Sequence, residues 1–212
     1  DWAAVVEGIY AQDRVMPMFI ERLGDELDRV GADVPAMTEF FTSDTGRKAV
    51  ALELSARRAL LDEAVEEAAL VKLEERRAAN DPRVADVDMF IEVNDLIEAN
   101  VTGGLNASLA FYRGMSEAGA FPEPLPEDEM LSEVWGQEPE IRAETEEWMT
   151  SFLLMAYAPL SDSELGAYTD FSGSRAGDQL NAALFAGFDA VFTDVSYRLG
   201  RSVATYVAGE NL

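Results

Sequence analysis

The stretch "AYTDFSGSRAGDQLN" (residues 167–181) shares a spaced pattern with "AMTEFFTSDTGRKAV" (residues 36–50). Both follow A-x-T-[DE]-F-x-x-S-x-x-G, so one polypeptide carries the same signature twice. The positions on which our structural interpretation depends are Phe40, Ser43, Gly46, Phe171, Ser174 and Gly177. A repeated spacing of this kind predicts a repeated piece of local structure.

In each copy the phenylalanine falls near the end of a short predicted helix, where its ring can pack onto the following helix. The serine stands where that second helix begins, and a serine N-cap satisfies an otherwise unpaired backbone N–H group. The glycine lies in the first turn, where the missing side chain lets two helices approach closely. The signature therefore predicts two corners of short helix, tight turn and long helix. It leaves open whether they mark an internal pseudo-repeat.

The rest of the chain predicts helices and no strands, because hairpin turns and alternating β-branched residues are nearly absent. We therefore expect an all-α helical bundle. Ser161 and Glu164 have the spacing of a capping box at the start of a short helix. The predicted helices span 2–30 with a break at Pro17, 35–41, 44–79, 82–100, 105–119, 140–159, 162–172 and 175–208.

Inside the predicted helix 44–79, apolar residues recur at helical spacing and predict a stripe that faces the core. The members of this stripe are Val50, Leu54, Leu61, Val65 and Ala68. The pairs Glu53–Arg57 and Arg58–Asp62 have i,i+4 spacing and predict ion pairs on the outer side. The segment "TGG" at 102–104 predicts the end of the helix that starts at Pro82.

Proline and acidic residues concentrate in residues 121–148, which marks the best candidate for a connection between two halves. We predict an N-terminal helical half over 1–120, a Pro/acid-rich connection over 121–137 and a C-terminal helical half over 138–212. Trp135 and Trp148 indicate that this region packs against something. The sequence leaves open whether the halves form one domain.

The last predicted helix carries aromatic residues at heptad spacing, with Phe185, Phe192 and Tyr206 on one stripe and Phe188 beside them. One interpretation makes this stripe the core of the bundle. The other makes it a groove or a dimer face, because exposed apolar stripes recruit partners. Gly187 and Gly200 lie within the same helix, where close helix packing would explain them.

The charge balance excludes several partners. The chain has 41 acidic and 16 basic residues, a formal net charge of −25. A surface this negative repels phosphate backbones, so we expect no nucleic-acid partner and no anionic membrane partner. No segment approaches the roughly 20 apolar residues of a membrane-spanning helix.

The absence of histidine and cysteine excludes familiar catalytic and metal sites. Serine–histidine–aspartate triads, cysteine–histidine pairs, haem histidines and the usual zinc sites all need one of these residues. We expect no cofactor and no catalytic residue. Glu127, Asp128 and Glu129 could hold a hard cation such as Ca²⁺ weakly, and a solvated loop explains them equally well. No acid stands in an apolar sequence context that predicts a raised pKa.

The segment "LSDSELGAYTDFSGSRAGDQLNAAL" resembles the core of a bacterial family known as domain of unknown function 2059 (DUF2059). "MTEFFTSDTGRKAV" resembles it more weakly. The resemblance implies an all-helical protein of the bacterial cell envelope, periplasmic or otherwise exported, made with a signal peptide. Removal of that peptide would explain why the sequence starts at Asp1 instead of methionine. The family implies no activity and no functional residue.

Two hypotheses follow from the sequence. The first is a non-catalytic envelope protein that binds another protein or forms a homodimer. The alternative is a ligand carrier or a carboxylate-based hydrolase, with an apolar cavity between the helical halves.

Overall fold

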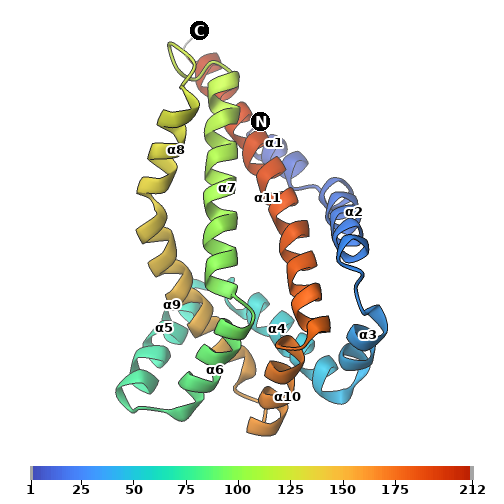
Figure 1. Ribbon diagram of the computed structural model, residues 1–212. Coiled ribbons are helices and arrows are strands. Elements are labelled where there is room, and N and C mark those ends of the chain that lie inside the picture. The colour runs from blue at the N-terminus through green and yellow to red at the C-terminus, as the bar shows by residue number, and fades with distance from the viewer. Residues whose placement is uncertain (1, 211–212) are drawn as a thin grey trace. The chain divides into compact units, whose positions relative to one another are not determined.

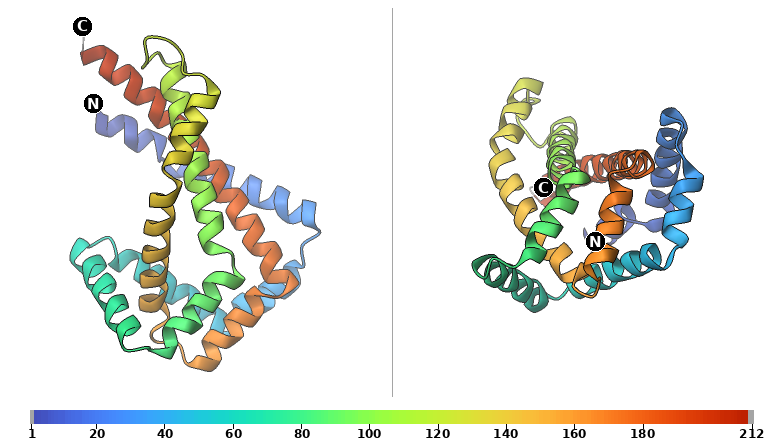
Figure 2. Two further views of the ribbon diagram at one scale, coloured as in Figure 1. Left: turned by 60° about the vertical axis from the view of Figure 1, so that its left-hand side comes forward. Right: turned by 60° about the horizontal axis from the view of Figure 1, so that its bottom comes forward.

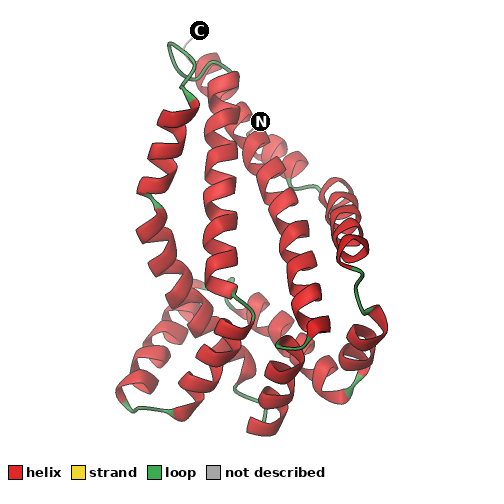
Figure 3. Ribbon diagram, in the orientation of Figure 1, coloured by secondary structure: helices red, strands yellow, loops and turns green. Residues whose placement is uncertain are grey.

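The computed structural model describes residues 2–210, and every regular element in that range is an α-helix (Figures 1 and 3). The predicted all-α class is therefore confirmed. The helices are α1 (Trp2–Ile9), α2 (Gln12–Val30), α3 (Val34–Thr42), α4 (Asp44–Ala59), α5 (Glu63–Ala78), α6 (Pro82–Val93), α7 (Leu96–Glu117), α8 (Glu127–Gly136), α9 (Glu138–Tyr157), α10 (Asp162–Ser172) and α11 (Arg175–Glu210).

The chain divides into two compact units, each assembled from separate segments. Unit 1 contains residues 1–29, 99–141 and 182–212, and unit 2 contains residues 30–98 and 142–181. The predicted halves were sequential, whereas these units interleave along the chain. Most of the predicted connection, 121–137, is helix α8 and belongs to unit 1.

The two signature copies form corners with matching hydrogen bonds in unit 2. Ser43 accepts a hydrogen bond from the Gly46 N–H group at 3.1 Å, and Ser174 accepts one from Gly177 at 3.2 Å. The Ser43 hydroxyl also donates to the Phe40 carbonyl, and the Ser174 hydroxyl to the Phe171 carbonyl, each at 2.6 Å. Both serines therefore cap the start of the following helix, as the spacing predicts.

Both corners also require a residue without a side chain. A Cβ atom at Gly46 would lie 2.2 Å from the Phe40 carbonyl oxygen, and one at Gly177 would lie 2.2 Å from the Phe171 carbonyl oxygen. Real Cβ atoms essentially never approach another heavy atom within 3.0 Å. The first turn of each long helix can therefore sit against the end of the short helix only because glycine stands there.

The two corners pack on each other through their signature phenylalanines. The rings of Phe40 and Phe171 stack with centroids 4.2 Å apart and planes 6° from parallel. Phe41 meets Phe171 edge-on at 5.4 Å, and Tyr168 stacks beside Phe40 at 5.3 Å. Such pairs contribute about 0.5–1.5 kcal/mol each beyond their buried area. The shared geometry is local, and descent of the two halves from one ancestral repeat stays a hypothesis.

The core of unit 2 centres on the second half of α9, which is buried. Arg83 of α6 closes the end of this helix by donating to the carbonyl oxygens of Tyr157 at 2.7 Å and Leu160 at 2.6 Å. The predicted capping box of Ser161 and Glu164 is present at the start of α10. These bonds satisfy carbonyl and N–H groups that helix ends leave without partners.

A buried amide ties the entry of α3 to the start of α11. Gln179 donates through Nε2 to the Val30 carbonyl at 3.0 Å and accepts through Oε1 from the Asp33 N–H group at 3.2 Å. Between them Gly31 has φ +59°, a left-handed conformation that ends a helix at little cost only for glycine.

In unit 1, α7 and α11 cross with their backbones in contact (Figures 1 and 2). A Cβ atom at Gly114 would lie 2.1 Å from the Tyr197 carbonyl oxygen, and one at Gly200 would lie 2.2 Å from that of Phe111. The contacts are reciprocal. In each helix, the glycine lies about one turn after the residue whose carbonyl oxygen contacts the glycine of the other helix. The expectation that Gly200 serves close packing is confirmed.

The predicted helix break at Pro17 is wrong. The chain breaks at Tyr10 and Ala11, where Arg14 donates through Nε to the carbonyl of Ile9 at 2.9 Å and so caps the end of α1. Pro17 lies within α2 on an exposed side. A proline there removes one hydrogen bond near the start of the helix, and α2 continues past it.

The predicted single helix 44–79 is also wrong, because a turn at Leu60–Asp62 separates α4 from α5. The Asp62 side chain accepts from the Ala64 N–H group at 3.0 Å and caps α5, so it does not serve an outer ion pair with Arg58. Leu61 projects from the turn and is 84% exposed. The predicted core stripe fails at Val50 and Leu54 as well, since both are about half exposed.

The "TGG" segment does not end a helix. The break lies earlier, at Asn94 and Asp95, where the Asn94 side chain donates to the Phe90 carbonyl at 2.8 Å. Asp95 has φ 50°, and aspartate is one of the few residues that tolerate this conformation. Helix α7 runs through Gly103 and Gly104 without interruption.

We expect Gly46→Ala and Gly177→Ala each to destabilise unit 2 by at least about 1–3 kcal/mol, because the new methyl group overlaps a carbonyl oxygen. Gly166→Ala on α10 is the matched control, since a Cβ atom there meets nothing within 4 Å. Urea denaturation measures all three. Equal stability of Gly177→Ala and wild type would show that the corner has been misinterpreted.

A second pair tests the crossing in unit 1. Gly114→Ala should destabilise the fold, whereas Gly103→Ala on the same helix α7 meets open space and should stabilise it by about 0.5–1 kcal/mol. Thermal denaturation of both variants compares the same substitution in one helix. Stabilisation by both would contradict a backbone contact at Gly114.

Candidate interaction surface

The aromatic stripe predicted on α11 is not the core of the bundle. Phe188 is 46% exposed, Phe192 is 51% exposed and Tyr206 is 49% exposed, while Phe185 is half-buried. The favoured interpretation of these rings as core residues is therefore wrong for three of the four. Their exposure is consistent with the other interpretation, a groove or an interface.

Helix α2 packs beside α11 and supports these rings. Gly187 leaves room for the Phe19 ring, whose atoms lie 2.8 Å from where a Cβ atom would stand. Phe19 then contacts Phe188 with ring centroids 4.9 Å apart, and Phe188 stacks on Phe192 at 6.2 Å. The expectation that Gly187 serves close packing is thus confirmed.

An ion-pair cluster also holds α2 and α11 together. Arg14 of α2 pairs with Asp194 of α11, and Asp194 also accepts from Arg198 at 2.9 Å. Although burial opposes ionisation, the hydrogen bonds and charges of the two arginines hold the pKa of Asp194 below its usual value. Asp194 therefore stays ionised and fixes the crossing of the two helices.

The two helices together present one apolar surface, which we call the α2–α11 face. It consists of the contacting rings of Phe19, Phe188 and Phe192. Met16 is 41% exposed and Ile20 is 58% exposed, and they lie within about one helical turn of Phe19. On α11 the exposed rings of Phe188 and Phe192 have i,i+4 spacing and therefore lie on one side of that helix.

Sequence analysis did not find the α2 part of this face. The signal was present in "VMPMFI" at 15–20, where apolar residues surround most of the helix instead of one side. A helix needs only one apolar stripe for its core contact, so the extra residues indicated a second apolar side.

Tyr206 belongs to a different cluster. Its ring contacts Trp2 of α1 with centroids 5.4 Å apart. Fourteen residues of helix separate it from Phe192, a distance of about 21 Å along the axis. The structure therefore groups Phe188 and Phe192 but does not bring Tyr206 to them.

Unit 2 contains a half-buried carboxylate that the sequence did not reveal. Glu53 lies on the inner side of α4 and accepts a hydrogen bond from the Tyr157 hydroxyl at 2.7 Å. Burial raises the pKa of Glu53, while hydrogen bonds from Tyr157 and Tyr168 and the charge of Arg57 oppose that shift. Our expectation that Glu53 sits on the outer side, and that no acid has a raised pKa, is wrong.

Of the three residues in this cluster, Tyr157 is buried, whereas Glu53 and Tyr168 are half-buried. Tyr157 is 1% exposed, and burial, together with the nearby Glu53 charge, raises the pKa of both Tyr157 and Tyr168. Every buried side-chain nitrogen and oxygen atom in the described part of the chain has a hydrogen-bond partner. The cluster therefore links α4 to α9 through a hydrogen bond beside the core of unit 2.

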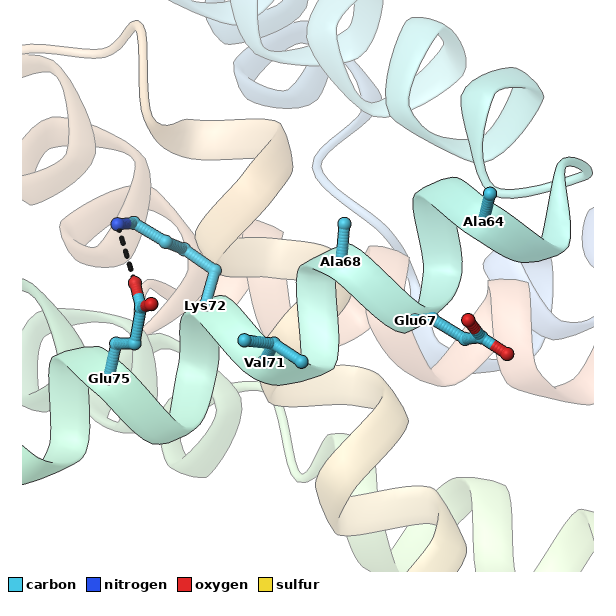
Figure 4. A pocket seen from close by; sticks show the side chains of 6 residues that line it. All are labelled: Ala64, Glu67, Ala68, Val71, Lys72 and Glu75. Carbon is cyan, nitrogen blue, oxygen red and sulfur yellow. Dashed lines mark hydrogen bonds and ion pairs between the residues drawn. The ribbon is translucent and has the colours of Figure 1, made fainter.

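Two surface depressions offer no catalytic arrangement. One, of about 490 Å³, follows α5 and is lined by Ala64, Glu67, Ala68, Val71, Lys72 and Glu75 (Figure 4). All its lining comes from a single helix, where Lys72 and Glu75 pair at 2.9 Å. The other, of about 310 Å³, is lined by Ala107, Ser108, Phe111, Tyr112, Gln137 and Ser196. Neither includes a residue of the aromatic stripe.

The acidic run at 127–129 occupies the first turn of α8. Acids in a first turn interact favourably with the helix dipole, and Glu127 also pairs with Arg113. Within residues 2–210, no three acidic side chains come close enough together to hold a metal ion. The cation-binding idea therefore gains no geometric support from Glu127, Asp128 and Glu129.

No family model matches the chain, and neither a curated protein nor a solved structure matches it. The resemblance to the DUF2059 family consequently stays a hypothesis. None of the helices between residues 2 and 210 is long and apolar enough to span a membrane.

We expect Glu53→Gln to leave the free energy of unfolding at about pH 7 unchanged or to raise it, because burial disfavours the charged carboxylate. The raised pKa means that the folded state holds this proton more tightly than the unfolded state. Protonation therefore stabilises the fold below the ordinary pKa of 4.5, and this contribution is lost as pH rises through the raised folded-state pKa. The advantage of the variant should shrink as pH falls, as measured by urea titrations.

Glu164→Gln is the control of opposite sign. A hydrogen bond from Lys48 is the largest cause that lowers the pKa of Glu164 to about 2. The contribution of ionised Glu164 to the free energy of unfolding is present above the ordinary pKa of 4.5. It disappears as pH falls toward about 2. A Glu53→Gln variant that is less stable than wild type at every pH would contradict the raised pKa.

Proposed function

We propose that this chain is a non-catalytic helical protein of the bacterial cell envelope that binds another protein through the α2–α11 face. The observation that carries the proposal is the exposed pair Phe188 and Phe192, stacked on each other and supported from α2 by Phe19. Aromatic side chains held rigidly at a surface lose little entropy on binding, which is why they dominate protein interfaces.

The support of these rings distinguishes them from scattered apolar residues elsewhere. Single exposed side chains, such as Leu61 in the α4–α5 turn, are common on soluble proteins and need no partner. The α2–α11 face instead gathers contacting aromatic rings from two helices that an ion pair fixes in place. Water contact with such a contiguous apolar area is unfavourable, and a protein partner removes it.

Composition and geometry also support a non-catalytic role. The chain has neither histidine nor cysteine, and Glu53, whose pKa is raised, accepts a hydrogen bond from Tyr157 beside the core of unit 2. Neither surface depression offers the enclosed apolar cavity that the alternative, a carrier or a carboxylate hydrolase, calls for. The envelope location rests on the family resemblance alone.

Site-specific photo-crosslinking in the native cell tests this proposal. We expect benzoyl-phenylalanine at position 192 to give a discrete adduct with another protein, and Phe188→Asp to abolish it. The same probe at Leu61 is the control, because that side chain is exposed but stands outside the face. An adduct with the mass of two copies of the chain, or no adduct at 192, would overturn the proposal.

A matched stability measurement separates binding from folding. Since about half of each ring is already in water, we expect Phe188→Ser and Phe192→Ser each to lower the free energy of unfolding by only about 1 kcal/mol. Thermal denaturation of the purified variants checks this. A collapse of the fold would instead place these rings in the core.

A further inference from the structure

We propose that the depression of about 310 Å³ in unit 1 binds a single uncharged sugar ring, independently of the α2–α11 face. Four of its six lining residues come from α7, one comes from α11, and one stands at the junction of α8 and α9. Helix α7 lies between α8 and α11 (Figures 1 and 2). The lining residues are Ala107, Ser108, Phe111, Tyr112, Gln137 and Ser196.

The four residues from α7 lie on the same side of that helix. Ala107 and Phe111 have i,i+4 spacing, as do Ser108 and Tyr112, so the two pairs form neighbouring rows. Ser196 joins these rows from α11, and Gln137 joins them from the chain between α8 and α9. The depression is therefore built by three separate parts of unit 1 and does not follow one helix alone.

The polar side chains in this lining are available to a ligand. They provide three hydroxyl groups and one amide, which can both donate and accept hydrogen bonds. Within the described part of the chain, none of them makes a side-chain hydrogen bond to the protein, and all are half-buried. Water hydrates these groups until a ligand with matching groups replaces it. The residues are Ser108, Tyr112, Gln137 and Ser196.

Two half-buried aromatic rings supply the apolar part of the lining. Phe111 and Tyr112 meet edge-on with ring centroids 6.3 Å apart. Aromatic side chains combined with a few uncharged polar groups are typical of small-molecule sites. A sugar ring has the complementary pattern, because hydroxyl groups surround its rim and C–H groups make its faces apolar. The volume of about 310 Å³ is near the lower end of the range for ligand pockets and favours one ring over a longer chain.

Charge narrows the ligand class further. None of the six lining residues is charged, although the whole chain carries a net charge of −25. The surrounding negative field repels anionic ligands such as phosphates and carboxylates. A cationic ligand would be attracted to the protein, but it would find no carboxylate in this lining. The depression therefore favours an uncharged ligand.

The two longest helices around the depression are held together before any ligand binds. Gly114 and Gly200 bring the backbones of α7 and α11 into contact about one turn beyond the lining residues of each helix. Asn106 of α7 also donates to Asp189 of α11 at 2.8 Å. A site that is already formed loses little conformational entropy on binding, so a few weak contacts are sufficient.

Saturation-transfer difference NMR spectroscopy with the full chain tests the proposal. The neutral probes are methyl β-D-glucopyranoside, methyl β-D-galactopyranoside and N-acetyl-D-glucosamine at millimolar concentrations. D-Glucuronate is the control, because it keeps the sugar ring and adds one negative charge. We expect saturation transfer to at least one neutral probe and none to glucuronate.

Three variants assign the binding to the depression. Tyr112→Phe keeps the ring and removes one hydroxyl group, so it should weaken the bound neutral probe by about two- to tenfold. Tyr10→Phe is the matched control, since Tyr10 is exposed and lies outside the lining, and its affinity should equal that of wild type. Ser196→Leu replaces a hydroxyl group with a larger apolar group and should abolish binding, with thermal denaturation as the check on folding.

The proposal is overturned if no neutral probe receives saturation. It is equally overturned if Tyr112→Phe binds the probe as tightly as wild type and Tyr10→Phe, because the sugar would then sit elsewhere. Glucuronate binding as tight as that of the neutral probes would contradict the argument from charge. None of these results bears on the α2–α11 face, which crosslinking at position 192 tests separately.

Discussion

The stack of Phe40 on Phe171 is the contact on which the architecture of unit 2 depends. Each ring stands near the end of a short helix, and the backbone of that short helix lies against a glycine in the next helix. The position of the ring therefore sets the direction of the next helix. Two corners built alike can meet ring to ring, and within unit 2 their contact fixes the start of α4 relative to the first residues of α11. The other aromatic contacts of this region, from Phe41 and Tyr168, surround the same pair.

The sequence predicted the parts of the fold that short-range chemistry controls. Serine caps, the capping box at Ser161 and the glycines at the corners depend on residues a few positions apart, and all were predicted. The failures have a different origin. At Leu60–Asp62 and at Asn94–Asp95 the chain breaks where a side chain caps a helix, although the apolar spacing continues past the break. Periodicity alone does not distinguish a bent helix pair from one long helix.

The candidate site was predictable only in part, because exposure depends on what packs against a helix. Heptad spacing predicted a stripe that contains Phe192, with Phe188 beside it, but a stripe that faces a neighbour and one that faces water have the same spacing. Glu53 illustrates the reverse case. Its i,i+4 relation to Arg57 is typical of a surface pair, whereas the tyrosines that bury it come from α9 and α10, more than a hundred residues away.

The reciprocal crossing of α7 and α11 has a consequence for how this protein can change over evolution. Gly114 and Gly200 each sit against the carbonyl of the opposite helix, so neither helix holds a side chain that could shrink to make room for a larger residue on the other. Pairs of core residues usually drift by exchanging volume, one growing as the other is reduced. Here each glycine contacts backbone, which cannot become smaller. Neither glycine can therefore be replaced by a larger residue unless the two helices move apart.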